Sequence, residues 1–279
     1  MGRAIAGFSG FLAALLLCLP NFARADFEDG WVAYVAGNYN FAYQEWLALA
    51  EEGHSGAQLN IGVLHEKGLG VPQDVVKAMQ WFERAAEGGE SAALHNIGII
   101  YRDGRGVPQD LAEAAKWFLK AAKNGDSHGR LQLGLATIGG LGVPKNVGDG
   151  VELIRKAAND NNPSAALELG TMYRQGRHIK QDSGKAVGWY ENAAASGSGA
   201  AAYALGTMFA EGDGAEVDPI RAYAWFWVAA RRGHSVADLA GRIVAESLQE
   251  SELKTAEELG MALIQGRRYE DVRLLMSRK

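Results

Sequence analysis

The chain has 279 residues, 48% of them apolar, and a formal net charge of −5. This acidic balance argues against general nucleic-acid binding. No apolar run after residue 25 is long enough to span a bilayer, so we expect no stable membrane insertion by the rest of the chain.

The N-terminal stretch is predicted to be a signal peptide covering residues 1–25. Arg3 supplies positive charge, an apolar run follows over residues 11–19, and residues 23–25 fit a small-x-small cleavage site. The alternative is an uncleaved membrane anchor, but the apolar run is short and Pro20 follows it. We therefore expect cleavage after Ala25.

Cleavage at this position changes the charge and the cysteine content of the chain. It removes Arg3, Arg24 and the single cysteine, Cys18, so lysine plus arginine falls from 28 to 26 while the acidic residues stay at 33. The mature net charge is then −7. Leu17 stands where a lipoprotein site has a small residue, so we expect no lipidation. A chain without cysteine suits an oxidising compartment.

From about residue 42 to residue 237 the sequence repeats itself every 36 residues without a gap. The complete units are 75–110, 111–146, 147–182 and 183–218. One column holds an unbroken run of glycines: Gly62, Gly98, Gly134, Gly170 and Gly206. A fixed period of this length indicates a solenoid of stacked supersecondary units.

Each unit is predicted to be a hairpin of two short helices. In the unit 75–110 an apolar stripe at helical spacing marks the first helix: Ala78, Trp81, Phe82, Ala85 and Ala86. Asp74 is its candidate N-cap, and Gly88-Gly89 ends it. The second helix runs from about residue 91 to residue 103, and a Gly- and Pro-containing connector follows.

The glycine column predicts a close contact between helices. A glycine inside a helix costs about 1 kcal/mol relative to alanine. Its recurrence in register therefore indicates that two helix backbones approach too closely for a side chain. Neither helix is long enough to be stable alone, so we expect neighbouring units to bury the aromatic rows between them, including Trp81, Trp117, Trp189 and Trp225.

The pattern resembles the Sel1-like repeat, a relative of the tetratricopeptide repeat. The matching residues run from Ala93 through Gly98, Tyr101 and the connector, and continue through Trp117-Phe118 to Gly125. The resemblance covers about residues 42–237. It implies an all-α fold, an α/α superhelical solenoid of helix hairpins, of the exported bacterial type.

The ends of the solenoid are predicted to be caps. Residues 26–40 form an N-terminal capping helix, with Trp31, Tyr34 and Val35 turned inward; residues 41–237 form the solenoid. Residues 238–279 form a helical cap and a basic tail. Within this C-terminal part we expect helices over 237–248 and 251–265, without a capping box, and a final helix that packs Val272 and Leu275. Trp227 is an aromatic residue outside the repeat columns.

The unit 147–182 departs most from the pattern. Leu153-Ile154 replaces Trp-Phe, and Arg177-His178-Ile179-Lys180 interrupts the connector. Two interpretations stay open. One is drift in a tolerant solenoid, and the other is a local change of curvature or a contact site for an acidic partner.

No catalytic or metal-binding constellation is evident, so we expect neither an enzyme nor a cofactor or metal site. The six histidines lack metal-ligand spacing. His54 and His234 follow hairpin-turn glycines and are expected to be merely tolerated there, whereas His65 is expected to be packed. The resemblance includes cysteine-rich relatives linked to β-lactams, so a cell-wall or β-lactam hydrolase is kept as an alternative.

The resemblance implies a protein-binding role. In related solenoids the first helix of each hairpin lines the concave surface, so the binding candidates are outward residues of first helices and the unusual loop: Lys77, Gln80, Glu83, Glu113, Lys116, Lys120, Arg177, His178, Lys180, Lys185 and Glu191. We expect a periplasmic scaffold or regulator that engages an envelope partner such as a sensor kinase or a secretion, polysaccharide or motility complex. A secreted factor that meets a host protein is the remaining alternative.

Overall fold

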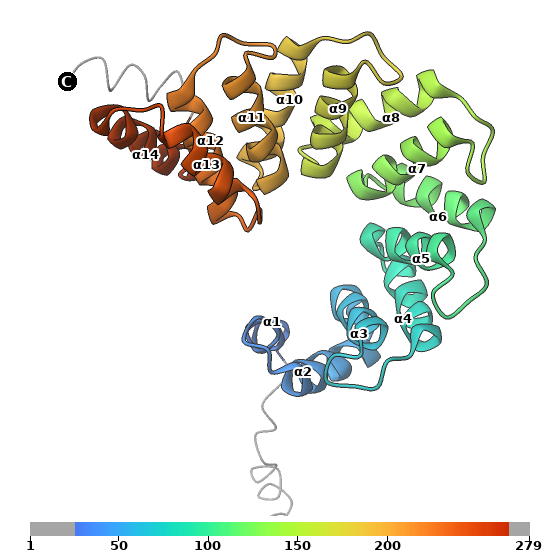
Figure 1. Cartoon of the computed structure of the whole chain (residues 1–279). Coiled ribbons are helices and arrows are strands. Elements are labelled where there is room, and N and C mark those ends of the chain that lie inside the picture. Colours follow the sequence, from blue (N-terminus) through green and yellow to red (C-terminus); the bar gives the residue numbers. More distant parts are fainter. Residues whose placement is uncertain (1–25, 268–279) are drawn as a thin grey trace, which may run out of the picture. The chain divides into compact units, whose positions relative to one another are not determined.

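A computed structural model describes residues 26–267, in which every regular element is a helix (Figure 1). The helices are α1 Phe27–Val35, α2 Tyr39–Glu51, α3 Ser55–Lys67, α4 Val75–Glu87, α5 Ser91–Asp103, α6 Leu111–Lys123, α7 Ser127–Gly139, α8 Val147–Asn159, α9 Pro163–Gln175, α10 Ser183–Ala195, α11 Gly199–Glu211, α12 Pro219–Arg231, α13 Ala237–Ala245 and α14 Glu250–Ile264. The predicted all-α solenoid of helix hairpins is confirmed. The predicted signal peptide, 1–25, and residues 268–279 of the predicted basic tail lie outside the described residues.

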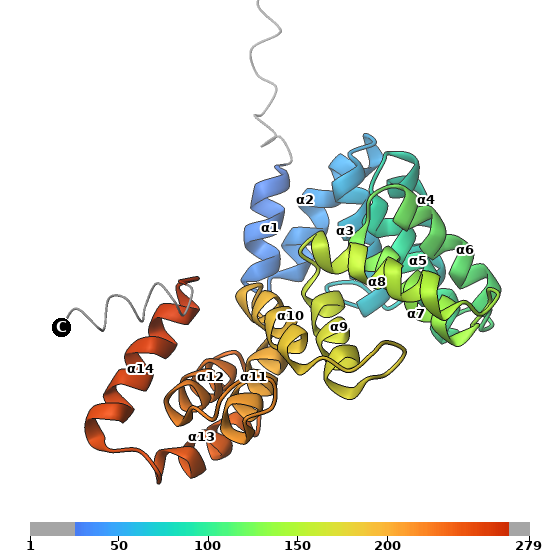
Figure 2. The same ribbon diagram turned by 90° about the horizontal axis from the view of Figure 1, so that it is seen from above.

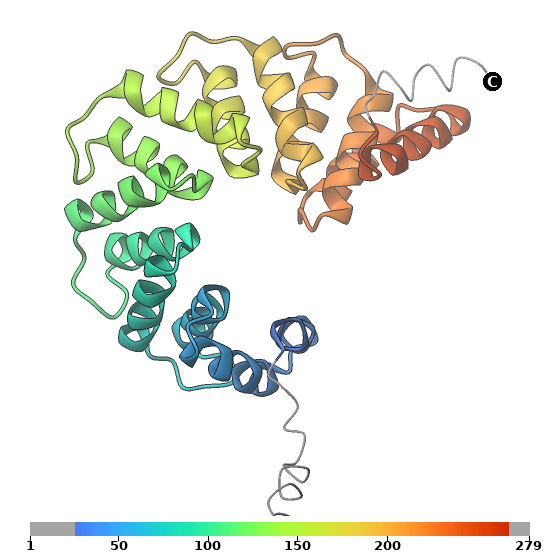
Figure 3. The same cartoon turned by 180° about the vertical axis from the view of Figure 1, so that it is seen from behind.

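The chain divides into two compact units, one ending at Trp81 and the other beginning at Phe82, within α4. In the second unit the helices from α5 to α12 follow one another in chain order, each packed beside the next (Figure 3). The even-numbered helices from α2 to α12 are the first helices of the hairpins, and the odd-numbered helices from α3 to α13 are the second helices.

The helix ends recur with the repeat. The first helices α4, α6, α8, α10 and α12 each follow an Asp or Asn whose side chain accepts a backbone N–H. Asp74, the predicted N-cap, accepts from Lys77 N at 3.0 Å. The second helices from α3 to α11 each end on a glycine with positive φ, such as Gly104 at 65°. These caps satisfy backbone groups that a helix end would leave unpaired.

A side chain from the next first helix covers the column glycine. A Cβ atom on Gly98 would lie 2.5 Å from Cε1 of Phe118, and one on Gly206 would lie 2.6 Å from Cδ1 of Phe226. At these two glycines an aromatic ring fills the space, so the predicted approach of two helix backbones is wrong there. The tryptophan that precedes the ring differs in burial between these two units. Trp117 is half-buried, whereas Trp225 is buried as expected.

Helix α1 is a second helix that has no first helix of its own within residues 26–267. Gly30 touches the ring of Trp46 as Gly98 touches Phe118, but it lies 16 rather than 20 residues before its ring, because the loop from α1 to α2 is short. Trp46 Nε1 donates to the carbonyl oxygen of Phe27 at 3.1 Å.

The predicted inward face of α1 is wrong for two of its three residues. Trp31 is 47% exposed and Val35 is 71% exposed, while Tyr34 is half-buried. The reason is that Gly30 and Ala33 form the buried side of the helix, so Trp31 and Val35 lie on the opposite side.

The C-terminal cap departs from the repeat. Helix α13 is shorter than predicted and ends at Ala245, and α14 begins at Glu250. Figure 2 shows α13 and α14 diverging after the turn that joins them, and α14 packs mainly against α12. Trp227 lies against Gly260 of α14, where a Cβ atom would be 2.8 Å from its ring. The extra aromatic residue of α12 therefore packs against the cap.

The expectation that α14 lacks a capping box is wrong. Gln249 is the N-cap, and its backbone N–H donates to Oε2 of Glu252 at 2.9 Å, while the Gln249 side chain accepts from the backbone of Glu252. The sequence pattern missed this box because Gln replaces the usual Ser or Thr at the N-cap.

The irregular unit 147–182 has its own packing. Ile154 replaces the aromatic ring, and a glycine, Gly150, replaces the alanine found at this column elsewhere. A Cβ atom on Gly134 would lie 2.9 Å from the oxygen of Gly150, and one on Gly150 would lie 2.7 Å from the oxygen of Gly134. The backbones of α7 and α8 thus approach directly at this pair of glycines.

The same unit contains two non-glycine residues with positive φ, Asn161 at 60° and His178 at 69°. The column of His178 holds glycines in the neighbouring units, Gly142 at 74° and Gly214 at 82°. A residue with a Cβ atom is strained in this region of φ by roughly 1–2 kcal/mol.

We expect His178→Gly to raise the free energy of unfolding by about 0.5–1 kcal/mol, because the relief of strain exceeds the extra chain entropy of glycine. Thermal unfolding measures the change. His128→Gly, inside the exposed first turn of α7, is the matched control and should destabilise. A decrease in stability for His178→Gly would show that its side chain makes contacts worth more than the strain.

Candidate protein-interaction surface

Three hollows in the second unit occupy equivalent repeat positions. Each is bounded by the last turns of a first helix and by the second helix that follows it; two of them are closed by the next first helix. One lining column is Glu83, Leu119 and Trp227, spaced by one and three periods. A second is Glu87, Lys123 and Arg231, and a third is Leu94, Arg130 and Asp238. The repeat therefore builds the same hollow with different chemistry.

The hollow between α4, α5 and α6 has a volume of about 340 Å³. Glu83 and Glu87 of α4 form one wall, and Trp117 and Lys120 of α6 form the other. The Lys120 ammonium lies 3.8 Å from the centre of the Trp117 ring, a cation–π distance. An acidic wall thus faces a cationic and aromatic wall.

The hollow between α6, α7 and α8 is larger, about 480 Å³, and more basic. Lys123, Arg130 and Lys156 line it, and the one acidic lining residue, Asp160, is ion-paired with Arg130. Leu153, at the column of Trp117, gives it an apolar wall. The replacement of tryptophan by leucine in the irregular unit therefore changes one wall of this hollow.

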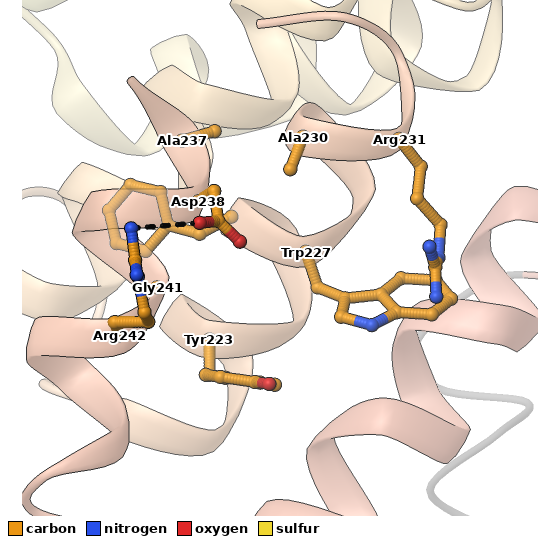
Figure 4. A pocket seen from close by; sticks show the side chains of 9 residues that line it. Tyr223, Trp227, Ala230, Arg231, Ala237, Asp238, Gly241 and Arg242 are labelled. Carbon is orange, nitrogen blue, oxygen red and sulfur yellow. Dashed lines mark ion pairs between the residues drawn. The ribbon is translucent and has the colours of Figure 1, made fainter. Parts of the chain in front are cut away.

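The hollow between α12 and α13, about 490 Å³, lies at the C-terminal cap (Figure 4). The Arg231 guanidinium lies over the Trp227 ring at 3.7 Å, and Arg242 pairs with Asp238 at 3.1 Å. Figure 4 shows these two pairs on opposite sides of the hollow, with Tyr223 between them. Among the residues that the structure describes, no next first helix closes this site.

The structure divides the sequence-predicted binding residues into three groups. Glu83 and Lys120 line the first hollow. A second group forms local ion pairs at helix starts: Lys77 with Asp74 at 3.6 Å, Lys116 with Glu113 at 2.8 Å, and Lys185 with Asp182 at 3.1 Å. The third group is exposed outside these hollows: Gln80, Arg177, His178, Lys180 and Glu191.

The local pairs have electrostatic consequences. The backbone N–H and the ammonium of Lys185 lower the pKa of the Asp182 carboxyl, and the hydrogen bond from Lys116 to Glu113 raises the pKa of Lys116. In the loop, Arg177 pairs with Glu168 of α9, which neutralises part of its basic character.

Residues near the ends of the first helices were missed by the sequence reasoning. Glu87, Lys123 and Arg231 line the hollows but share no residue type, so no repeated residue marks this column in the sequence. The sequence signal that could have identified this column is the variation of its residue type from unit to unit. A column that varies freely within a strict repeat is one that packing does not constrain.

The expectation that His54 and His234 are merely tolerated in their turns is wrong, because both make specific contacts. His54 is the N-cap of α3, where its Nδ1 accepts from Ala57 N at 3.1 Å, and His234 stacks on Tyr203 at 4.3 Å. His65 is buried as predicted, and burial lowers its pKa; burial also lowers the pKa of His95. Within residues 26–267 no group of three His, Cys, Asp or Glu side chains could hold a metal ion.

Within residues 26–267, none of the helices from α1 to α14 combines the length and the apolar character needed to cross a bilayer.

Solved structures resemble this chain over most of its length. A protective antigen of uropathogenic Escherichia coli with an SLR fold is 28% identical with a TM-score of 0.70, over 91% of this chain and 55% of that protein. This chain therefore spans about half the length of that relative. A Sel1 repeat protein from Oxalobacter formigenes is 29% identical with a TM-score of 0.69, over 85% of this chain and 99% of that one.

A more distant structure shares the fold alone. An immunity protein from Pseudomonas aeruginosa is 18% identical with a TM-score of 0.53, over 90% of this chain and 92% of that one. No curated protein matches the sequence.

The family of repeat is shown by a match of five consecutive segments to the Sel1 repeat, at residues 55–90, 91–126, 127–162, 163–198 and 199–234. Each segment has the predicted 36-residue length and begins at or next to the start of a second helix. Such repeats generally build non-catalytic scaffolds for protein interaction. Since these matches cover more than half of its residues, the chain belongs to the Sel1 repeat family.

Proposed function

We propose that this protein is an exported, periplasmic scaffold or regulator that binds an envelope partner through the repeat hollows. The observation that carries the proposal is the recurrence of one hollow with changing walls: acidic and aromatic at Glu83 and Trp117, basic at Lys123 and Lys156, and aromatic and basic at Trp227 and Arg231. A row of pockets of different charge selects one extended partner surface over others.

The partner is expected to place an apolar or aromatic side chain against Trp117 and a carboxylate near Lys123 and Lys156. Tryptophan and arginine at the edge of a hollow are the residue types that most often anchor protein interfaces. A signal peptide over residues 1–25 would deliver the chain to the compartment in which such a partner meets it.

Crosslinking in cells tests this proposal. A photoreactive residue at Glu87, Lys123 or Arg231 is expected to capture the same envelope protein, identified by mass spectrometry. The same residue at Lys145, exposed in a connector, is the control and should not capture it. Equal capture from hollow and connector positions would contradict the proposal, as would capture from neither.

A charge reversal on one helix sharpens the test. Lys120→Glu should lower capture of the partner about tenfold, because it reverses the charge beside Trp117. Lys116→Glu, one turn earlier on α6 and paired with Glu113 outside the hollow, should leave capture within twofold. Equal losses from both variants would indicate a general charge effect.

A secreted, host-facing role is the second candidate, supported by the description of the Escherichia coli relative as a protective antigen. Cell fractionation separates the two. Protein in the periplasmic fraction with Asp26 as its first residue supports the first proposal, and protein in the culture medium supports the second.

A further inference from the structure

Helix α1 presents an apolar face that the fold covers at every other equivalent position. Val32 lies two residues after Gly30, and the residues two after the other column glycines are all buried: Leu64, Ile100, Ala136, Met172 and Met208. Val32 is 66% exposed. The difference arises because α3, α7, α9 and α11 each pack against the first helix of their own hairpin, whereas α1 has no such helix among the described residues.

The exposed side of α1 combines apolar and acidic residues. Trp31, Val32 and Val35 are exposed on it, flanked by the exposed acids Glu28 and Asp29. At 100° per residue these five side chains fall on one face of the nine-residue helix. We call this set the α1 face.

The charge around the α1 face has one sign. From residue 26 to residue 66 the chain holds seven acidic residues and no lysine or arginine. Removing these seven from the 33 acids, and the two arginines before residue 26 from the 28 basic residues, leaves 26 of each sign over residues 67–279. The net charge of −7 predicted for the mature chain therefore resides entirely in the segment that contains α1, α2 and nearly all of α3.

The two histidines of this segment do not offset the acids. His54 uses Nδ1 as an acceptor at the start of α3, and burial and the nearby Lys77 lower the pKa of His65. A ligand for the α1 face must therefore bring apolar side chains for Trp31, Val32 and Val35, and positive charge for Glu28 and Asp29.

We propose that the α1 face docks a basic amphipathic helix of a partner protein, in the place that a first helix occupies in every later hairpin. A helix is the occupant that the fold itself uses against this face of a second helix. Its apolar stripe would cover Val32 and Val35, and its lysines or arginines would pair with the flanking acids. This surface lies outside the repeat hollows, so it goes beyond the proposed function and is changed by different substitutions.

Peptide binding to the whole exported protein tests this inference. Two fluorescent 16-residue helical peptides share one leucine stripe; one carries lysines on its polar face and the other glutamates. The lysine peptide is expected to bind at least tenfold more tightly in fluorescence anisotropy. Equal affinities would overturn the proposal.

Substitutions locate the binding. Val32→Ser with Val35→Ser should weaken the lysine peptide at least tenfold without changing the fold, because both side chains are exposed. Ile243→Ser is the matched control, since Ile243 is 61% exposed on α13, and should leave affinity within twofold. An unchanged affinity of the double variant would show diffuse charge attraction and overturn the proposal.

Two other occupants would also overturn it. Sedimentation that shows a dimer dissociated by the double variant would assign the α1 face to a second copy of the chain. Retention of residues 1–25 in the exported protein, with tighter peptide binding after their removal, would assign it to the chain's own N-terminal segment.

Discussion

Replacing Gly98 with valine is expected to lower the free energy of unfolding by about 3 kcal/mol, at the upper end of the cost of overpacking a core. The Cβ atom alone would lie 2.5 Å from Cε1 of Phe118, and Phe118 is only 2% exposed. The ring cannot move aside, so α5 and α6 must separate and lose the contacts around it. Chemical and thermal unfolding followed by circular dichroism measure the loss.

Gly188→Ala provides the matched control. Gly188 also lies inside a helix, α10, but it is exposed and a Cβ atom there would meet nothing within 4 Å. Alanine should stabilise this position by up to about 1 kcal/mol through helix propensity. If both variants changed stability by the same amount, the steric account of the glycine column would fail. Gly98→Val with Phe118→Leu should recover part of the loss.

The repeat and its hairpins were predictable because they depend on spacing within one unit. The apolar stripe that includes Trp117 and Phe118, at i, i+3 and i+4 spacing, marks a first helix. The glycine column that includes Gly104 marks the end of each second helix. The glycine column could be read as a steric requirement from its recurrence alone. What fills the space could not, since a ring and a backbone both exclude a Cβ atom.

The ends of the solenoid were harder to predict because the period fails there. Gly30 stands 16 residues before Trp46 instead of 20, so a search at fixed spacing misses the pairing that defines α1. Without that pairing, the large apolar residues Trp31 and Val35 are assigned to the core by type. In the structure the small residues Gly30 and Ala33 occupy the buried side.

The candidate site was predictable only in part. The first helices were chosen by analogy with related solenoids, and Glu83 and Lys120 do line a hollow. Lys77 and Lys185 instead pair with the N-cap aspartates one turn before them. Sequence spacing shows that such residues are near an N-cap, but whether the ammonium turns to the cap or to a hollow depends on packing between units.

In the irregular unit, Gly150→Ala is expected to lower the free energy of unfolding by about 1–3 kcal/mol. This loss is expected although alanine is the better helix former and stands at this column in α6, α10 and α12. The Cβ atom would lie 2.7 Å from the oxygen of Gly134 and 2.6 Å from Cγ1 of Ile138. Gly148→Ala, two residues earlier in α8 and free of close neighbours, should be neutral or stabilising.

The double variant Gly134→Ala with Gly150→Ala distinguishes random drift of the repeat sequence from a close contact that compensates for the missing aromatic ring. Each Cβ atom alone must push α7 and α8 apart, and the second then enters a gap that the first has opened. The combined loss in unfolding free energy should therefore fall short of the sum of the single losses by at least about 1 kcal/mol, a coupling typical of residues that share one contact. Additive losses would mean that the two glycines act independently, as expected of drift. Coupled losses would mean that the close backbone approach replaces the missing ring of this unit, so that a change of curvature at α7 and α8 is built into the sequence.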